Sequence, residues 1–194
     1  MCDVTASEPR STRPRTSRTQ GRRNIIEATI RLLATRAPDE ITVRQIAEES
    51  GHHHRMVQAW FGGKIALFLA VHEQLNEAIA EQLTPPLGSG GISEHVRMTT
   101  ALMNWLIAAD PTVFENRTST PILDQLTSIY ESGYGLDPRD ARMMALRSVA
   151  GSITAALFPG PLGISDQDLA ELTEFEERLV QLLAASRTDG SPAA

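Results

Sequence analysis

The stretch ITVRQIAEESGHHHRMVQAWFGGKIAL, residues 41–67, decides the fold. Thr42 is a favourable N-cap, and Gln45 follows three residues later, so the pair predicts a capping box at the start of a short helix. Gly51 can end this helix, because glycine adopts the left-handed conformation without strain. We expect a second short helix over residues 53–61, crossing the first at a steep angle. This pattern predicts a helix-turn-helix, whose second helix can enter a DNA major groove.

Three motifs in register extend this pattern in both directions. They have the forms R-x-x-I-x-x-A, T-V-R-x-I-A-x-x-x-G and an aromatic-Phe pair followed by a small turn and K-x-x-L. The residues that carry them are Arg22, Ile25, Ala28, Thr42, Val43, Arg44, Ile46, Ala47, Gly51, Trp60, Phe61, Gly63, Lys64 and Leu67. Over residues 22–69 the chain therefore resembles the DNA-binding domain of the TetR/AcrR family of bacterial transcriptional regulators.

The second helix departs from the family pattern. His52 and His53 stand where the family usually has a small or apolar residue and then Ser or Thr. Gln58 replaces a Tyr that commonly contacts a phosphate, and its amide can donate to a phosphate or pair with an adenine edge. These changes leave the expected fold intact and leave the operator sequence open.

The composition favours an all-α globular protein. The chain has 194 residues, of which 41% are hydrophobic, and its apolar residues recur at helical spacing without a long alternating run. We expect a flexible basic arm over residues 1–20 and a helix-turn-helix DNA-binding domain over 21–64. A helical ligand-binding and dimerisation domain is expected over 65–194, as the resemblance implies.

Charge is distributed unevenly along the chain. Through Lys64 there are 11 Lys and Arg against 7 Asp and Glu, a net charge of +4, whereas the remainder carries −10. This asymmetry suggests that the part of the chain through Lys64 binds an anionic polymer such as DNA. The alternative is that the arginines of the arm, Arg10, Arg13, Arg15 and Arg18, belong to an unstructured tail.

The sequence also suggests a cellular location. Cys2 is the only cysteine, so no intrachain disulfide is possible, which fits a reducing compartment. No stretch reaches the length of about 18 apolar residues that a membrane span requires. We expect a cytoplasmic protein associated with the nucleoid, with no membrane partner.

Residues at the start of the second helix are expected to meet base edges, and their neighbours to contact phosphates. Arg55 can bind a guanine through two hydrogen bonds, and Thr42 and Arg44 lie at a helix N-terminus that favours anions. The predicted contacts to double-stranded operator DNA are Arg22, Thr42, Arg44, His52, His53, His54, Arg55, Gln58, Trp60 and Lys64.

The three consecutive histidines do not predict a metal site. Adjacent residues on a helix point about 100° apart and cannot chelate one ion together, and no H-E-x-x-H pattern is present. An enzyme with its site at the histidines is a weaker reading, because the chain lacks a nucleophile–base pair or a phosphate loop. We expect no metal, no cofactor and no catalytic activity. A role of the histidines in pH-dependent DNA affinity stays open.

Further helices are expected after the DNA-binding part, with proline or glycine between them. The first helix of the chain should cover residues 21–36, and the later ones 64–83, 93–109, 120–133, 137–158 and 165–186. Residues 159–163 are expected to form a loop.

The resemblance implies a small-molecule pocket among the middle helices. Large apolar and Met side chains suit an adaptable cavity for a small apolar or amphipathic ligand. The candidate lining residues are Met98, Leu102, Met103, Trp105, Leu106, Phe114, Ile122, Leu126, Ile129, Tyr130 and Tyr134.

The last two long helices carry broad small-residue and apolar stripes. Both stripes can be intrachain core, but the resemblance implies a homodimer interface built from these helices. Its predicted residues are Ala145, Val149, Ser152, Ile153, Ala156, Leu172, Phe175, Leu179 and Leu182. A symmetric dimer would place two recognition helices about 34–36 Å apart, on successive turns of the major groove.

The leading interpretation is a dimeric repressor that a ligand releases from its operator. The alternative is a DNA-binding dimer without an inducer, whose body serves only dimerisation or protein interaction.

Overall fold

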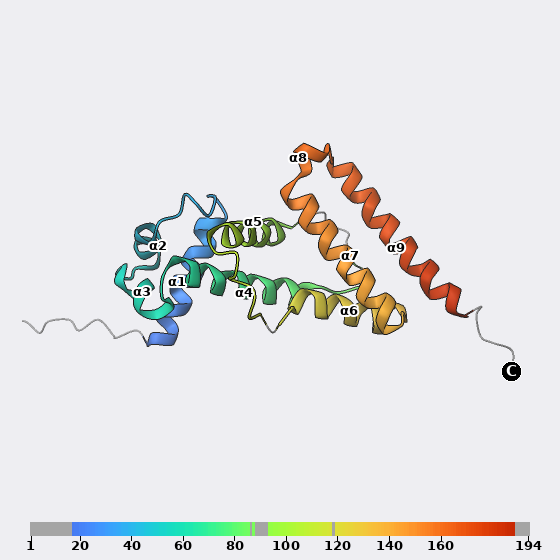
Figure 1. Ribbon diagram of the computed structural model, residues 1–194, viewed down its shortest axis with the longest axis horizontal. Coiled ribbons are helices and arrows are strands. Elements are labelled where there is room, and N and C mark those ends of the chain that lie inside the picture. Colours follow the sequence, from blue (N-terminus) through green and yellow to red (C-terminus); the bar gives the residue numbers. More distant parts are fainter. Residues whose placement is uncertain (1–16, 86, 88–92, 118, 189–194) are drawn as a thin grey trace, which may run out of the picture.

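The computed structural model describes residues 17–85, 87, 93–117 and 119–188, and these residues form helices without any strand (Figure 1). The all-α expectation is confirmed. The helices are α1 Arg18–Leu33, α2 Val43–Ser50, α3 Arg55–Phe61, α4 Lys64–Gln82, α5 Glu94–Ala109, α6 Pro121–Tyr134, α7 Pro138–Leu157, α8 Pro159–Leu162 and α9 Asp166–Thr188.

Helices α1 to α3 gather at one end of the molecule, and α4 runs from them toward α6 and α7 (Figure 1). The core of this end is closed, since Ile25, Ile46 and Leu67 are fully buried and Val57 is 1% exposed. The same cluster of side chains continues along α4 to Leu75 and across to Leu102 and Leu106 of α5. Removal of this apolar surface from water holds α5 against the helix-turn-helix unit.

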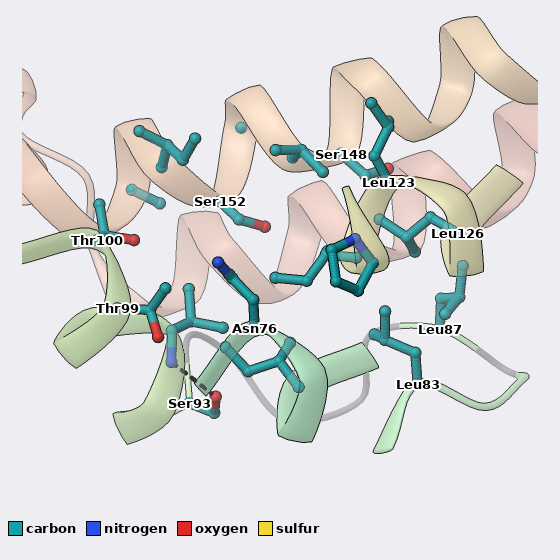
Figure 2. Close-up of a pocket in the computed structure, with 18 of the residues that line it drawn as sticks. Asn76, Leu83, Leu87, Ser93, Thr99, Thr100, Leu123, Leu126, Ser148 and Ser152 are labelled. Atoms are coloured by element: carbon teal, nitrogen blue, oxygen red, sulfur yellow. Dashed lines mark hydrogen bonds between the residues drawn. The ribbon is translucent and has the colours of Figure 1, made fainter. Parts of the chain in front are cut away.

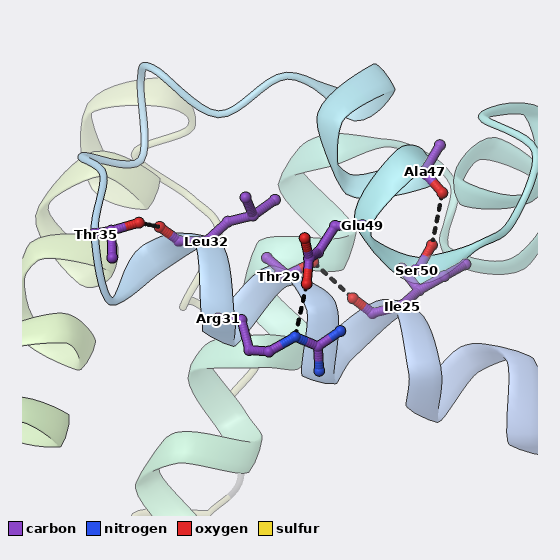
Figure 3. A network of polar contacts seen from close by, with 8 residues as sticks. All are labelled: Ile25, Thr29, Arg31, Leu32, Thr35, Ala47, Glu49 and Ser50. Carbon is purple, nitrogen blue, oxygen red and sulfur yellow. Dashed lines mark hydrogen bonds and ion pairs between the residues drawn. The ribbon is translucent and has the colours of Figure 1, made fainter.

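An exposed ion pair links α1 to α2 (Figure 3). Arg31 of α1 donates from Nε to Glu49 of α2 over 2.8 Å, and both side chains are in contact with solvent. The buried hydroxyl of Thr29 donates to the carbonyl oxygen of Ile25 in its own helix over 2.8 Å. The hydroxyl of Thr29 is thus satisfied within its helix, whereas the exposed ion pair links two helices.

A second apolar cluster lies at the opposite end of the molecule. It is centred on α6 and α7, with Leu126, Tyr130, Ala141 and Met144 buried, and α9 contributes the buried side chain of Val180. Figure 1 shows α7 and α9 as two long helices joined by the short α8, with α9 at the outer edge of the molecule.

Several helix boundaries differ from the predicted ones. Helix α1 begins at Arg18 rather than at residue 21, because the hydroxyl of Ser17 accepts a hydrogen bond from the Gln20 amide and caps the helix there. It ends at Leu33 rather than at residue 36, and α3 begins at Arg55 rather than at residue 53. Arg18 therefore lies in α1, while Arg10, Arg13 and Arg15 of the expected arm lie outside the described residues.

Residues 159–163 were expected to form a loop, and this prediction was wrong. Pro159 starts the one-turn helix α8, where its fixed φ favours the first helical position, and Gly163 ends it at a φ of 65°. The remaining helices match the predicted ranges to within about two residues. Within the part of the chain that the structure describes, no helix has the length and apolar content to cross a membrane.

Candidate nucleic-acid interface and ligand cavity

The helix-turn-helix is built from caps that the local sequence encodes. The backbone amide of Thr42 donates to Oε1 of Gln45 over 2.7 Å, and the Gln45 amide donates to the Thr42 hydroxyl over 3.2 Å. This is the predicted capping box at the start of α2. Gly51 ends α2 at a φ of 69°, which is the left-handed region that glycine favours.

Part of the predicted DNA-contacting set is exposed on α2, α3 and the turn between them. Thr42, Arg44, Arg55 and Gln58 are exposed, and so are His53 and His54. Within the described ranges, neither Arg44 nor Arg55 takes part in an ion pair, so both guanidinium groups are available to an anion. The imidazoles of His53 and His54 lie against one another, with their centroids 4.2 Å apart.

Two predicted phosphate-binding cations are instead held by contacts within the chain. Arg22 donates to the carbonyl oxygen of Trp60 and lies 4.2 Å from the ring centroid of Phe61. These contacts tie α1 to the end of α3, which gives Arg22 an evident structural role. Its contact with a phosphate stays a prediction.

Lys64 is likewise enclosed by its neighbours. Its ammonium donates to the carbonyl oxygen of Pro38 over 2.9 Å and lies 4.9 Å and 4.7 Å from the rings of Phe68 and Trp105. Burial lowers the pKa of Lys64, and the negative charge of Asp39 opposes this shift. The side chain thus joins the start of α4 to α5 and to the segment before α2.

Trp60 and His52 are also turned toward the protein. Trp60 lies so close to Gly21 of α1 that a Cβ at this glycine would meet its indole ring. His52 and Trp60 form a T-shaped ring pair with centroids 5.5 Å apart, and the buried Nε2 of His52 has no hydrogen-bond partner among the described residues. Within these ranges, no group of three or more His, Cys, Asp or Glu side chains is arranged to hold a metal ion.

A cavity of about 510 Å³ lies between α4, α5, α6, α7 and α9. Its volume falls in the range of ~300–1,000 Å³ typical of small-molecule sites. Figure 2 shows Leu83, Leu87, Leu123 and Leu126 toward one side of it, and Asn76, Thr99, Thr100 and Ser152 toward the other. Helix α9 adds Leu169, Leu172, Thr173 and Glu176 to the wall.

The polar groups on the α4 side of the cavity are held in a neutral network. Asn76 donates from Nδ2 to Nδ1 of His72 over 3.1 Å, and the imidazole lies 5.2 Å from the ring of Phe114. Burial lowers the pKa of His72 to about 4, and the positive charge of Arg117 adds to this effect. His72 is therefore uncharged near neutral pH.

The groups on the α6–α7 side have partners. The Tyr130 hydroxyl and Ser148 Oγ are 2.9 Å apart, and burial raises the pKa of Tyr130. Glu176 of α9 accepts a hydrogen bond from Arg147 of α7 over 2.7 Å. Burial raises the pKa of Glu176, although the charge of Arg147 works against that shift.

The cavity includes four of the predicted lining residues, namely Met103, Ile122, Leu126 and Tyr130. The other seven lie outside its wall. Met98, Leu102, Leu106 and Ile129 are buried, while Trp105, Phe114 and Tyr134 are partly buried and pack against the two cores. Sequence reasoning missed His72 and Asn76, although polar residues at positions 72 and 76 on the helical face of Ile79 and Leu83 were a detectable sign of a polar wall.

The predicted dimer-interface residues fall into four groups. Val149, Ser152, Ile153 and Leu172 line the cavity, and Ala145 is buried in the second core. Phe175 is 49% exposed and Leu182 is 67% exposed. Leu179 and Ala156 are half-buried, and Leu179 packs against the second core.

Known proteins resemble this chain in sequence and in fold. No family model matches the sequence. A curated relative, the HTH-type transcriptional regulator BetI of Brucella anthropi, is 36% identical over 67 residues, which are 34% of each chain. The match thus spans about a third of the length of that relative.

Solved structures resemble most of the chain. The TetR-family repressor AlkX from Dietzia sp. strain DQ12-45-1b, implicated in biodegradation of n-alkanes, matches with a TM-score of 0.54 and 19% identity, covering 87% of this chain and 99% of that one. A TetR-like transcriptional regulator from Rhodococcus sp. RHA1 matches with a TM-score of 0.42 and 15% identity, covering 91% and 100%.

BetI is an HTH-type transcriptional regulator and AlkX is a TetR-family repressor, and this chain has the fold of helix-turn-helix regulators. More specifically, the chain has the fold of the TetR family.

Proposed function

We propose that this protein is a transcriptional regulator that binds double-stranded operator DNA as a symmetric dimer and leaves it when a small molecule enters the cavity. The observation that carries the proposal is the capped helix-turn-helix with Arg44 and Arg55 exposed and without an ion-pair partner among the described residues. The similarity to a curated HTH-type regulator and the repressor activity of a protein with this fold support repression as the mode of action. Binding to chromosomal DNA would place the protein on the nucleoid, in the cytoplasm.

The apolar surface of α7 and α9 supports the dimer. Met143, Leu146, Phe175 and Leu182 are each more than 40% exposed, and Leu162 of α8 is 58% exposed. Soluble monomers rarely expose a large contiguous apolar patch, and a second copy of the same helices would cover it.

The position of α4 supports regulation by a ligand. This helix begins at Lys64, directly after α3 and the glycine turn, and carries His72, Asn76 and Ile79 in the cavity wall. A ligand that binds better to one arrangement of α4 would shift the population of dimers toward a spacing of the recognition helices that DNA does not accept.

The test is DNA binding by the purified protein on a duplex covering the region upstream of its own gene. We expect binding that resists excess competitor DNA, weakens with salt and is lost in Arg55→Ala. Arg139→Ala removes an exposed arginine at the start of α7 and serves as the matched control. Sequence-specific regulation would be overturned if the protein bound every duplex equally and weakly, and if a selection from random sequences also yielded no preferred site.

A further inference from the structure

We infer that the cavity takes a medium-chain carboxylate, with its head group at Thr99, Asn76 and Arg117 and its alkyl chain among the leucines. The inference rests on the proposed function only for the regulatory role of this ligand. The chemistry of the cavity wall carries the rest.

One side of the cavity is apolar and the other is polar (Figure 2). Leu83, Leu87, Leu123 and Leu126 form an apolar side, which Ile122 and Pro121 extend. Asn76, Thr99 and Thr100 form a polar side on α4 and α5. A molecule with one polar end and one apolar end can satisfy both sides, whereas a uniformly apolar molecule would leave buried polar groups without partners.

The polar side contains a hydroxyl that lacks a partner. Thr99 is 6% exposed, and its buried Oγ1 has no hydrogen-bond partner among the described residues. Buried polar atoms of this kind are uncommon in native proteins, and a ligand or an ordered water is the usual explanation. The amide of Asn76 has two protons, and the contact with His72 uses one of them. Both groups can therefore donate to an oxygen in the cavity.

Arg117 gives this side its charge. Its guanidinium donates from Nε to the Ser119 carbonyl over 2.9 Å and lies 5.6 Å from the Phe114 ring, and within the described ranges it has no ion-pair partner. The ring of Phe114 in turn contacts His72, so the cation stands beside the His72–Asn76 pair. The remaining guanidinium N–H groups suit the two oxygens of a carboxylate.

Among the described residues, the cavity wall has no unpaired negative charge that could bind a cationic ligand. Glu176 is the acidic residue of the cavity wall in the described part of the chain, and Arg147 already binds it over 2.7 Å. His72 is neutral near pH 7 and adds no charge of either sign. The balance of free charge in the cavity is therefore positive, which favours an anion over an ammonium group of the same size.

The experiment compares head groups at constant chain length with the full-length protein in the absence of DNA. Decanoate, decanol and decylammonium are titrated below their micelle concentrations by isothermal calorimetry. We expect one decanoate per chain, with decanol at least tenfold weaker and decylammonium weaker again. Across octanoate, decanoate and dodecanoate, affinity should rise about three- to fourfold per methylene, as burial of each CH₂ implies. Equal or tighter binding of decylammonium or decanol would overturn the inference, as would an absence of decanoate binding.

Two variants locate the head group. Arg117→Gln should reduce decanoate affinity about tenfold while leaving decanol affinity unchanged, which also shows that the cavity is still folded. Thr99→Val keeps the shape of the side chain and should weaken both ligands modestly. Arg139→Gln is the surface control. Unchanged decanoate affinity in Arg117→Gln, with decanol binding retained, would contradict the assigned orientation.

A separate release assay distinguishes this inference from the proposed function. If decanoate binds through Arg117 but leaves a specific DNA complex intact, the ligand class stands and the inducer role fails. If decylammonium releases the complex and decanoate does not, ligand-responsive regulation stands and the ligand class is wrong.

Discussion

The helix-turn-helix end and the α7–α9 end of the molecule differ in how completely one chain buries its apolar side chains. At the first end, Ile25, Ile46 and Leu67 are fully buried, and α2 is capped at both ends by its own residues. At the second end, Phe175 and Leu182 of α9 remain widely exposed, although they lie on an apolar stripe. The contrast implies that the first end buries its apolar side chains within one chain, whereas the second leaves exposed the apolar surface that the proposed dimer would cover.

The largest expected effect comes from making the same change, leucine to alanine, at each end of the molecule and comparing the two losses of stability. Leu67→Ala should lower the free energy of unfolding by about 2–5 kcal/mol, because it leaves a cavity in a closed core. Leu182→Ala should have little effect on the unfolding of the isolated chain, because 67% of that side chain is already exposed. Urea denaturation at several protein concentrations measures both effects. Equal losses that do not depend on concentration would refute the contrast.

The same contrast explains which features the sequence could predict. Thr42, Gln45 and Gly51 act on their immediate neighbours, so their caps can be inferred from spacing alone. The cavity depends on contacts between distant segments. The spacing of His72 and Asn76 indicates a polar stripe on α4, but it does not show which helices lie opposite that stripe. Met98, Leu102 and Leu106 are the converse case, since a large apolar side chain on a helix fits a core as well as a pocket.

Two other features could not be inferred from the local sequence. Lys64 was predicted from the sequence to contact DNA, and only the folded structure shows Pro38, Phe68 and Trp105 around its ammonium. The short helix α8 replaces an expected loop, because a proline that breaks one helix can also start the next.

The next effect concerns α4, the helix that joins the two ends. The folded pKa of His72 is about 4, below its unfolded value near 6.5, so the unfolded state binds more protons between these pH values. Stability from neutral His72 is therefore complete above about pH 6.5 and falls as the pH drops toward 4. We expect a loss of about 2–3 kcal/mol over this range.

His72→Asn removes the titrating group and should flatten this part of the profile. The informative quantity is the difference between the unfolding free energies of wild type and variant, measured by urea denaturation from pH 7 to 4.5. Taking the difference cancels the carboxylates that titrate in both proteins. A difference that does not change with pH would show that His72 is exposed to water in the native state, and α4 would then be less firmly packed than the helix-turn-helix core.

A smaller effect is expected at the exposed face of α9. Leu182→Glu places a charge where we propose that a second chain packs, and it should weaken dimerisation by about 2 kcal/mol, roughly 30-fold in the dissociation constant. Ile107→Glu is the matched control, because Ile107 is 45% exposed but lies on α5. Sedimentation velocity over a range of concentrations measures both. If the α5 variant dissociates and the α9 variant does not, the open end of the molecule has been assigned to the wrong helices.

The smallest expected effect lies at the closed end, in the ion pair between Arg31 and Glu49 (Figure 3). Its side chains are 55% and 39% exposed, so water and salt screen the attraction even though the two atoms are 2.8 Å apart. A double-mutant cycle with Arg31→Met and Glu49→Gln should give a coupling energy below about 1 kcal/mol that shrinks as salt is added. A coupling energy comparable to the loss in Leu67→Ala would mean that the α1–α2 contact depends on charge. Because α1 and α2 already share the buried side chains of Ile25 and Ile46, we expect apolar packing to set the orientation of the helix-turn-helix and the ion pair to adjust it only slightly.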